Sequence, residues 1–149
     1  MAVDKSIQPQ VIRLKTQLVK KGRSRILLSE TGNSTFRIHC YATGTGENAL
    51  HAHLNEDHTF VVLQGEATFY GPNDETRTIG KNEGVLLPHG TFYWFKATSD
   101  EPLVMVRIGA AAFDGIDRHG RINPDGSEMR GDSVENKQVE VIMSDRWFR

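Results

Sequence analysis

Three of the chain's six histidines lie within one short segment, His51-Ala-His53-Leu-Asn-Glu-Asp-His58. Residues two apart on a β-strand point to the same face of a sheet, so the imidazoles of His51 and His53 can converge on one point. A third imidazole that arrives after a short turn completes a set of nitrogen ligands typical of mononuclear metal sites. The alternative is a solvated turn, but the concentration of histidines here favours the metal site.

Glycine and proline residues accompany the histidines at regular spacings. Gly46 precedes the pair and Gly65 follows it, and a second motif leads from Gly84 through three apolar residues to Pro88-His89-Gly90-Thr91-Phe92-Tyr93. Over about residues 34–110 this pattern resembles the two sequence motifs of the cupin superfamily. The resemblance implies an all-β fold, a cupin-like jelly-roll β-barrel of short and mostly antiparallel strands.

Two positions depart from the pattern of that family. The position that usually holds a glutamate ligand is His58, and the position of the second-motif histidine is Tyr93. The asparagine that is frequent four residues further on is replaced by Ala97. Glu56 and Asp57 lie nearby, and their spacing places them on the turn rather than in the ligand position. These differences leave open both the identity of the metal and its fourth ligand.

The expected cofactor is one divalent metal ion per chain, bound by His51, His53 and His58. Neutral imidazoles leave the charge of the ion uncompensated, so the ion is a strong Lewis acid that favours anionic oxygen ligands. Three protein ligands also leave coordination positions open for a substrate and for water or dioxygen. We expect Fe(II), with Ni, Cu or Zn as alternatives, because imidazole suits all four metals.

Tyr93 has three interpretations. It is a metal ligand as phenolate, a proton donor to a bound substrate, or a packing residue of the barrel on the same face as Phe95. We name it as the candidate catalytic residue. Phe60, Phe95 and Arg107 are the candidate residues of the substrate pocket, with Arg107 as an anion clamp if it points inward. His89, on the turn after Pro88, is expected at the surface.

The elements that must position these residues are predicted as short strands from apolar alternation. Residues 34–42 alternate between an apolar face (Phe36, Ile38, Cys40, Ala42) and a polar face (Arg37, His39, Tyr41), which indicates a half-buried strand. Further strands are predicted at Phe60–Leu63, Glu66–Tyr70, Val85–Leu87, Thr91–Lys96 and Leu103–Ile108. We expect Cys40 to be a small buried hydrophobe rather than a nucleophile.

The whole chain, 1–149, is expected to be a single cupin-like domain. Its core is predicted at about 34–110, with an N-terminal arm and strands at 1–33 and a C-terminal extension at 111–149. The chain ends on Trp147 and Phe148, two large aromatics that we expect to be buried against the barrel or a partner subunit. Cupins are frequently dimers, so the resemblance and the terminal aromatics together predict a homodimer.

Composition limits the partners and the compartment. The chain has 149 residues, 38% of them apolar, and a formal net charge of -1, so no basic region suggests nucleic acid. No apolar run is long enough for a membrane span, and the first residues lack a secretory signal pattern. A single cysteine fits a reducing compartment. We therefore expect a cytoplasmic protein with a small-molecule substrate, no nucleic-acid partner and no membrane association.

Three classes of function follow. The first is a mononuclear non-haem Fe(II) dioxygenase acting on a small anionic or chelating substrate, an enolisable compound, a carboxylate or a phenol. The second is a non-redox lyase, isomerase or hydrolase in which the metal holds an enolate and Tyr93 donates a proton. The third is a non-catalytic barrel that binds a metal or a ligand. Fold alone does not separate them, because one barrel hosts many chemistries. The resemblance to cupins makes the first class the main prediction, because all-histidine iron sites in that superfamily are often dioxygenases.

Overall fold

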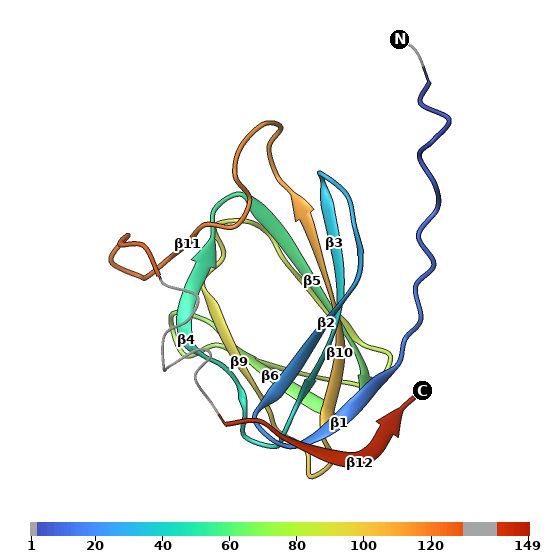
Figure 1. Cartoon of the computed structure of the whole chain (residues 1–149). Helices are drawn as coiled ribbons and strands as arrows, with labels where there is room; N and C mark the ends of the chain where they lie inside the picture. Colours follow the sequence, from blue (N-terminus) through green and yellow to red (C-terminus); the bar gives the residue numbers. More distant parts are fainter. Residues whose placement is uncertain (1–2, 130–139) are drawn as a thin grey trace.

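The computed structural model of the chain describes residues 3–129 and 140–149. Within these residues the regular structure consists of β-strands, and none of it forms an α-helix (Figure 1). Among the same residues there is therefore no helix with the length and apolar character that a membrane crossing requires. The prediction of an all-β jelly-roll fold is confirmed.

Two five-stranded antiparallel sheets form the barrel, in the orders β2-β3-β10-β5-β8 and β11-β4-β9-β6-β7, and β1 pairs with β12 in a separate sheet. The strands are β1 (Thr16–Lys21), β2 (Arg23–Glu30), β3 (Ser34–Tyr41), β4 (Gly46–His53), β5 (Glu56–Gln64), β6 (Glu66–Tyr70), β7 (Thr76–Gly80), β8 (Gly84–Leu87), β9 (Tyr93–Ala97), β10 (Leu103–Ala111), β11 (Arg121–Ile122) and β12 (Ile142–Phe148).

The six strands that were predicted from apolar alternation are all present, and three of them are longer than predicted. The sequence pattern missed β7, in which Ile79 is the only buried side chain. It also missed β1, which lies in a segment that reads as a polar arm. Backbone pairing joins β7 to β6 and β1 to β12, and β1 also buries the adjacent side chains of Leu18 and Val19, which do not alternate. A pattern of side chains cannot reveal pairing of that kind.

The polar face of β3 differs from the sequence interpretation. Strand β3 is not half-buried, because both of its faces are covered. Ile38 and Cys40 pack under β1 in an outer apolar cluster, and their side chains are fully buried. His39 and Tyr41 point the other way, into the barrel, and are also fully buried. The polar residues of β3 are therefore interior groups, and the sheet of β1 and β12 is what covers its apolar face.

The interior of the barrel is divided between an apolar and a polar part. The apolar part is a cluster of buried side chains that includes the aromatic rings of Tyr41, Phe60, Phe69, Tyr93 and Phe95. Phe60, Phe69 and Phe95 lie with their ring centroids 5.0–5.4 Å apart, within the range of favourable aromatic contacts. The histidines lie directly beside this cluster, so a packed aromatic base supports the candidate site.

The terminal aromatics are placed differently from one another. Phe148 packs against the outer apolar cluster, as predicted. The side chain of Trp147 is 44% exposed in the single chain, with the ammonium of Lys15 5.0 Å from its ring centroid. Burial against this barrel is therefore wrong for Trp147. Its burial across a two-fold interface stays a prediction, as does the homodimer.

Candidate metal and acid-base site

Four predicted site residues converge at one end of the aromatic cluster. His51 and His53 lie on β4, His58 lies on β5, and all three side chains are buried. The ring centroids of His51 and His53 are 5.1 Å apart, and those of His53 and His58 are 4.0 Å apart. Tyr93 is paired with His51 across β4 and β9, at a ring separation of 4.6 Å. The alternation on β4 and the pairing of the strands bring these side chains together.

The outer ring nitrogens of His51 and His53 have no hydrogen-bond partner. Nδ1 of His51 lies 2.8 Å from the carbonyl oxygen of Ala49 and donates to it, since a carbonyl can only accept. In the neutral ring this leaves a lone pair on Nε2. The Nε2 atoms of both histidines are buried and unpaired. A histidine that donates one nitrogen to a backbone carbonyl and presents the other unpaired is the arrangement found in metal-ligating histidines.

Glu47 is a residue of the site that the sequence interpretation missed. Its side chain is 7% exposed, and Oε2 lies 3.2 Å from Nε2 of His51, yet neither atom makes a hydrogen bond. Burial alone would raise the pKa of this carboxyl. Contact with His51 and the charge of Arg121 outweigh burial and hold the pKa well below its ordinary value. The signal was in the sequence, because alternation places residues 47, 51 and 53 on the same strand face.

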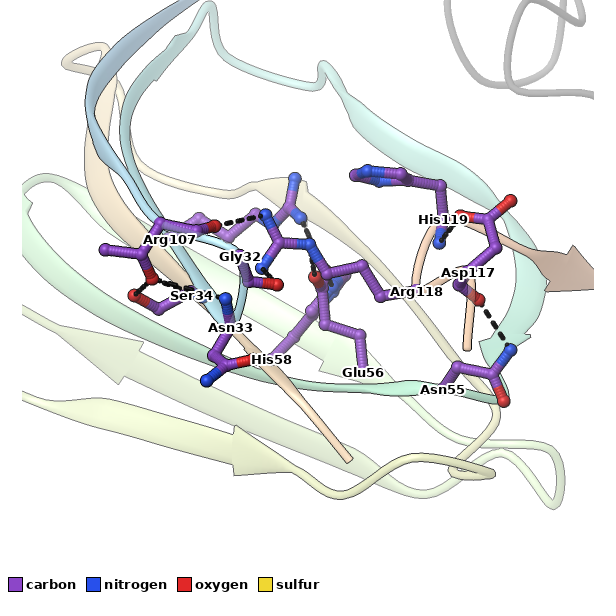
Figure 2. A network of polar contacts seen from close by, with 11 residues as sticks. Gly32, Asn33, Ser34, Asn55, Glu56, His58, Arg107, Asp117, Arg118 and His119 are labelled. Carbon is purple, nitrogen blue, oxygen red and sulfur yellow. Dashed lines mark hydrogen bonds and ion pairs between the residues drawn. The ribbon is translucent and has the colours of Figure 1, made fainter. Parts of the chain in front are cut away.

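His58 has partners on both ring nitrogens, and Figure 2 shows the side of the ring that faces Glu56. Nε2 lies 2.5 Å from Oε1 of Glu56, and Nδ1 lies 3.4 Å from the hydroxyl of Tyr93. Nη2 of Arg107 lies 3.0 Å from the same oxygen of Glu56. Nη2 of Arg107 also lies 3.2 Å from Nε2, but the ionised carboxylate is closer and can only accept, so we assign the proton to Nε2. This leaves Nδ1 as an acceptor facing the tyrosine hydroxyl.

The placement of Glu56 on a turn is wrong. Glu56 is the first residue of β5, its side chain is 2% exposed, and it points inward with His58. Pairing of β5 with β10 extends further than the apolar run that starts at Phe60, and this carries Glu56 into the sheet. Its neighbour Asp57 points outward and accepts a hydrogen bond from Nδ1 of His89 at 2.8 Å. His89 is exposed, as predicted.

Burial sets the protonation of the interior groups. It lowers the pKa of His53, an effect reinforced by the nearby His58. Burial also lowers the pKa of His58, although the bond to Glu56 acts in the opposite direction. It raises the pKa of Tyr93 well above its ordinary value, with the charge of Glu47 adding to the effect. At neutral pH His53 and His58 are thus uncharged, and Tyr93 keeps its proton.

The donor atoms are close together but are not arranged around a common point. In the described part of the chain, no three His, Cys, Asp or Glu side chains form a ready-made metal-binding group. The imidazole rings instead pack against one another. The buried and unpaired Nε2 atoms of His51 and His53, with the unpaired Oε2 of Glu47, nevertheless have the chemistry of metal ligands. These residues fit one divalent ion, because rotation of the imidazole rings about their side-chain bonds would direct these donor atoms to a common point.

A cavity of about 340 Å³ opens beside the histidines. His53 and Glu56 line it, and Arg107 does so too, which places this arginine where an anion clamp requires it. Phe60 and Phe95, which the sequence suggested as pocket residues, do not line this cavity. They belong to the packed aromatic cluster, where both side chains are at most 1% exposed. The cavity is polar because charged side chains, most of them arginines, form most of its lining.

Comparison with known proteins gives the same fold. A model of the cupin domain family (Cupin_2) matches residues 37–109. An uncharacterized protein of Bacillus subtilis (strain 168), YdbB, is 32% identical over 75 residues, which are 50% of this chain and 64% of the relative. The match therefore spans less than two thirds of that relative's length.

Solved structures extend the comparison beyond sequence. A conserved protein of Klebsiella pneumoniae with a double-stranded β-helix domain has a TM-score of 0.55 and 21% identity, over 60% of this chain and 72% of that protein. The KdgF structure from Halomonas sp. has a TM-score of 0.54 and 20% identity, over 62% of this chain and 83% of KdgF. With the two motifs, the family match and the barrel in agreement, residues 37–109 of this chain form a cupin domain.

Proposed function

We propose that this protein is a metal-dependent enzyme that moves a proton on a small anionic substrate, as a lyase or an isomerase. The observation that carries the proposal is the contact series from Glu56 through His58 to Tyr93, which ends beside the unpaired nitrogens of His51 and His53. A buried carboxylate, an imidazole and a phenol in contact are the parts of an acid-base relay. Of these residues His53 and Glu56 line the adjacent cavity, from which a small substrate would approach.

The residues that would hold the ion are His51, His53 and Glu47. Oε2 of Glu47 and Nε2 of His51 are 3.2 Å apart without a hydrogen bond. Two ligands at about 2.1 Å from one ion in tetrahedral or octahedral geometry stand roughly 3.0–3.4 Å apart. A bound divalent ion would act as a Lewis acid that polarises a substrate carboxylate or carbonyl oxygen.

In this arrangement His58 is not a metal ligand and can take part in proton transfer. As Tyr93 Oη accepts a proton from the substrate, its own proton passes to Nδ1 of His58. Glu56 stabilises the imidazolium that forms, because its carboxylate already lies 2.5 Å from Nε2. Reversal of the path returns a proton to the substrate. Arg107, 3.0 Å from Glu56, holds that carboxylate in its ionised form.

A dioxygenase is the second candidate, and the packing of three imidazoles favours it. His51, His53 and His58 lie in ring contact, and rotation of the His58 ring away from Glu56 would give the three-histidine set that the sequence predicts. Imidazole ligands suit Fe(II) as well as Ni, Cu and Zn. In that case His58 is a ligand and the relay is broken, so the two candidates make opposite predictions for the same residue.

The test is a comparison of metal content and reaction type. Purified protein is stripped of metal, reloaded separately with Fe(II), Zn and Ni, and assayed with hydroxy, keto and unsaturated carboxylates. The proposal expects substrate-dependent exchange of a carbon-bound proton with deuterium oxide, with equal rates in air and under nitrogen. Oxygen uptake that requires the substrate would establish the dioxygenase instead. Metal binding without either activity would leave a ligand-binding barrel.

A further inference from the structure

The cavity beside the histidines is lined by an unusual concentration of arginines. Five arginines and a single carboxylate, that of Glu56, form its charged walls, and the arginines are Arg25, Arg37, Arg107, Arg118 and Arg121. The positive charge therefore exceeds the negative charge by several units before any metal is bound. A concave site with low-dielectric walls and one sign of charge attracts ligands of the opposite charge.

Two of these arginines have internal partners. Arg118 donates to the carbonyl oxygens of Thr31 and Gly32 at 3.1 and 3.2 Å, and its Nε lies 3.5 Å from Glu56 (Figure 2). Arg107 donates to Glu56 at 3.0 Å, but its Nε is buried and unpaired. The one carboxylate of the cavity is thus shared between two cations and His58. The carboxylate of Glu56 is therefore not available to neutralise the other arginines.

The remaining three arginines form no salt bridge within the described residues. Arg25 is exposed, whereas Arg37 and Arg121 are half-buried. Nη1 of Arg121 is buried without a hydrogen bond, and the carboxylate of Glu47 acts on Arg121 and Arg25 only through longer-range electrostatics. Guanidinium groups without a direct carboxylate contact leave an external anion as the partner that this arrangement lacks.

The strand register places the arginines on the two sheets that form the barrel. Arg107 and Arg37 are directly opposite each other on β10 and β3, and Arg25 lies on β2, the next strand of the same sheet. Like charges directly opposite on paired strands destabilise a sheet. Arg121 lies on β11 in the other sheet, opposite His53. One cationic group therefore adjoins His53, and the second, in which Arg107 contacts His58, belongs to the other sheet.

We propose that the cavity binds a small organic dianion with two separate anionic groups, of which a dicarboxylate is the representative. One group lies at Arg121 and His53, where the proposed metal also is, and the other lies between Arg37 and Arg107. A monoanion would leave one end unpaired. The inference names the substrate class of the proposed function and rests on it only for the reaction, since both ends carry arginine without the metal.

The test uses calorimetric titration of the metal-free chain, so that it does not depend on the proposed chemistry. The probes are malonate, succinate and glutarate, each with two carboxylates, together with butyrate as the one-carboxylate control and inorganic phosphate as a dianion with its charges on one centre. We expect at least one dicarboxylate to bind tenfold or more tightly than both butyrate and phosphate. Equal binding of succinate and butyrate, tightest binding by phosphate, or no binding at all would overturn the inference.

Variants of Arg37 and Arg121 test which arginine binds each anionic group of the ligand. Arg37→Gln should reduce dicarboxylate affinity to the level of butyrate and leave butyrate binding unchanged within twofold. Because it removes one of two facing charges, it should also raise the Tm of the ligand-free protein, which a merely structural arginine would not do. Arg121→Gln should weaken both ligands. Arg77→Gln, on the exposed face of β7, is the matched control and should change neither.

The binding test and the function test fail independently. Dicarboxylate binding without turnover would retain this inference and refute the proposed enzyme. Turnover of a monocarboxylate, with R37Q as active as the parent chain, would support the proposed enzyme and refute this inference. A lower Tm in ligand-free R37Q with unaltered dicarboxylate affinity would assign Arg37 to the fold and overturn the inference.

Discussion

Oε1 of Glu56 and Nε2 of His58 lie 2.5 Å apart, on the inward face of the same strand and nearly shielded from solvent. Residues two apart on a strand share a face, and here the shared face turns a carboxylate and an imidazole toward each other. The contact fixes which nitrogen of His58 carries the proton. It thereby leaves Nδ1 as the acceptor that faces Tyr93, and the relay depends on this tautomer.

Glu56→Gln tests this contact. Glutamine keeps the size of the side chain but cannot stabilise an imidazolium, so we expect the rate of proton exchange to fall about 10²-fold or more. Metal content should stay unchanged, measured by elemental analysis. Asp57→Asn, on the outward face of the same strand, is the control and should keep its activity. Loss of metal in E56Q would place Glu56 in the metal site and contradict the relay.

Removal of either unpaired imidazole should abolish metal binding. We expect His51→Ala and His53→Ala each to lose most of the ion, because two remaining ligands rarely hold a metal against water and chelators. Isothermal titration with Zn, and the melting temperature with and without metal, measure the loss. His89→Ala removes an exposed histidine and is the control. Unchanged affinity in H53A would exclude the proposed centre.

Glu47 and His58 compete for the role of third ligand, and paired variants separate them. If Glu47 is the ligand, Glu47→Gln should weaken metal binding at least tenfold, and His58→Ala should retain the metal while losing turnover. If His58 is the ligand, H58A should lose the metal, and His58→Glu should keep it with reduced Lewis acidity. X-ray absorption of the Zn form counts the imidazoles and provides the readout that activity cannot.

Tyr93→Phe distinguishes the three roles of this residue. The change removes only the hydroxyl, so the aromatic contacts with His51 and Phe69 are retained. For a proton donor we expect turnover to fall about 10²–10⁴-fold with full metal occupancy. Loss of metal would identify a phenolate ligand, and unaltered turnover would identify a packing residue. Metal occupancy and turnover must both be measured, because each of the three roles predicts a different combination of the two.

The C-terminal strand should contribute stability through Phe148 and association through Trp147. Phe148→Ala should lower the free energy of unfolding by about 1–2 kcal/mol, since a half-buried aromatic loses less than a core one. Trp147→Ala should leave the monomer's stability nearly unaltered and shift the elution volume if the residue lies in a dimer interface. Deletion of the last three residues should combine both effects. An unchanged melting curve and elution volume would show that the tail does neither.

Cys40 should be unreactive until the protein unfolds. Its side chain is fully buried, and burial raises the pKa of its thiol, so the nucleophilic thiolate is scarce. We expect negligible labelling by a thiol reagent in the native protein and complete labelling in denaturant. Labelling across a denaturant series should then follow the unfolding measured by circular dichroism. Rapid native labelling would show that the sheet of β1 and β12 opens locally.

Local patterns in the sequence determined the strand faces and the first members of the site. The period of two along a strand was enough to place His51 and His53 together, and it also reaches Glu47. The resemblance to the cupin motifs, through the spacing to Gly65 and Gly90, located His58 and Tyr93. The chemistry of four neighbouring side chains was therefore readable without a structure.

Only the tertiary structure decided which face was inside and what converged there. Alternation on β3 identifies two faces but not the interior one, and the β1–β12 sheet turned its polar face inward. In the same way, the extension of β5 beyond its apolar run buried Glu56. The arginines come from two pairs of consecutive strands far apart in sequence, and no local period relates Arg25 and Arg37 to Arg107 and Arg121. Their charge becomes a site only because antiparallel pairing closes the barrel and brings those strands to one cavity.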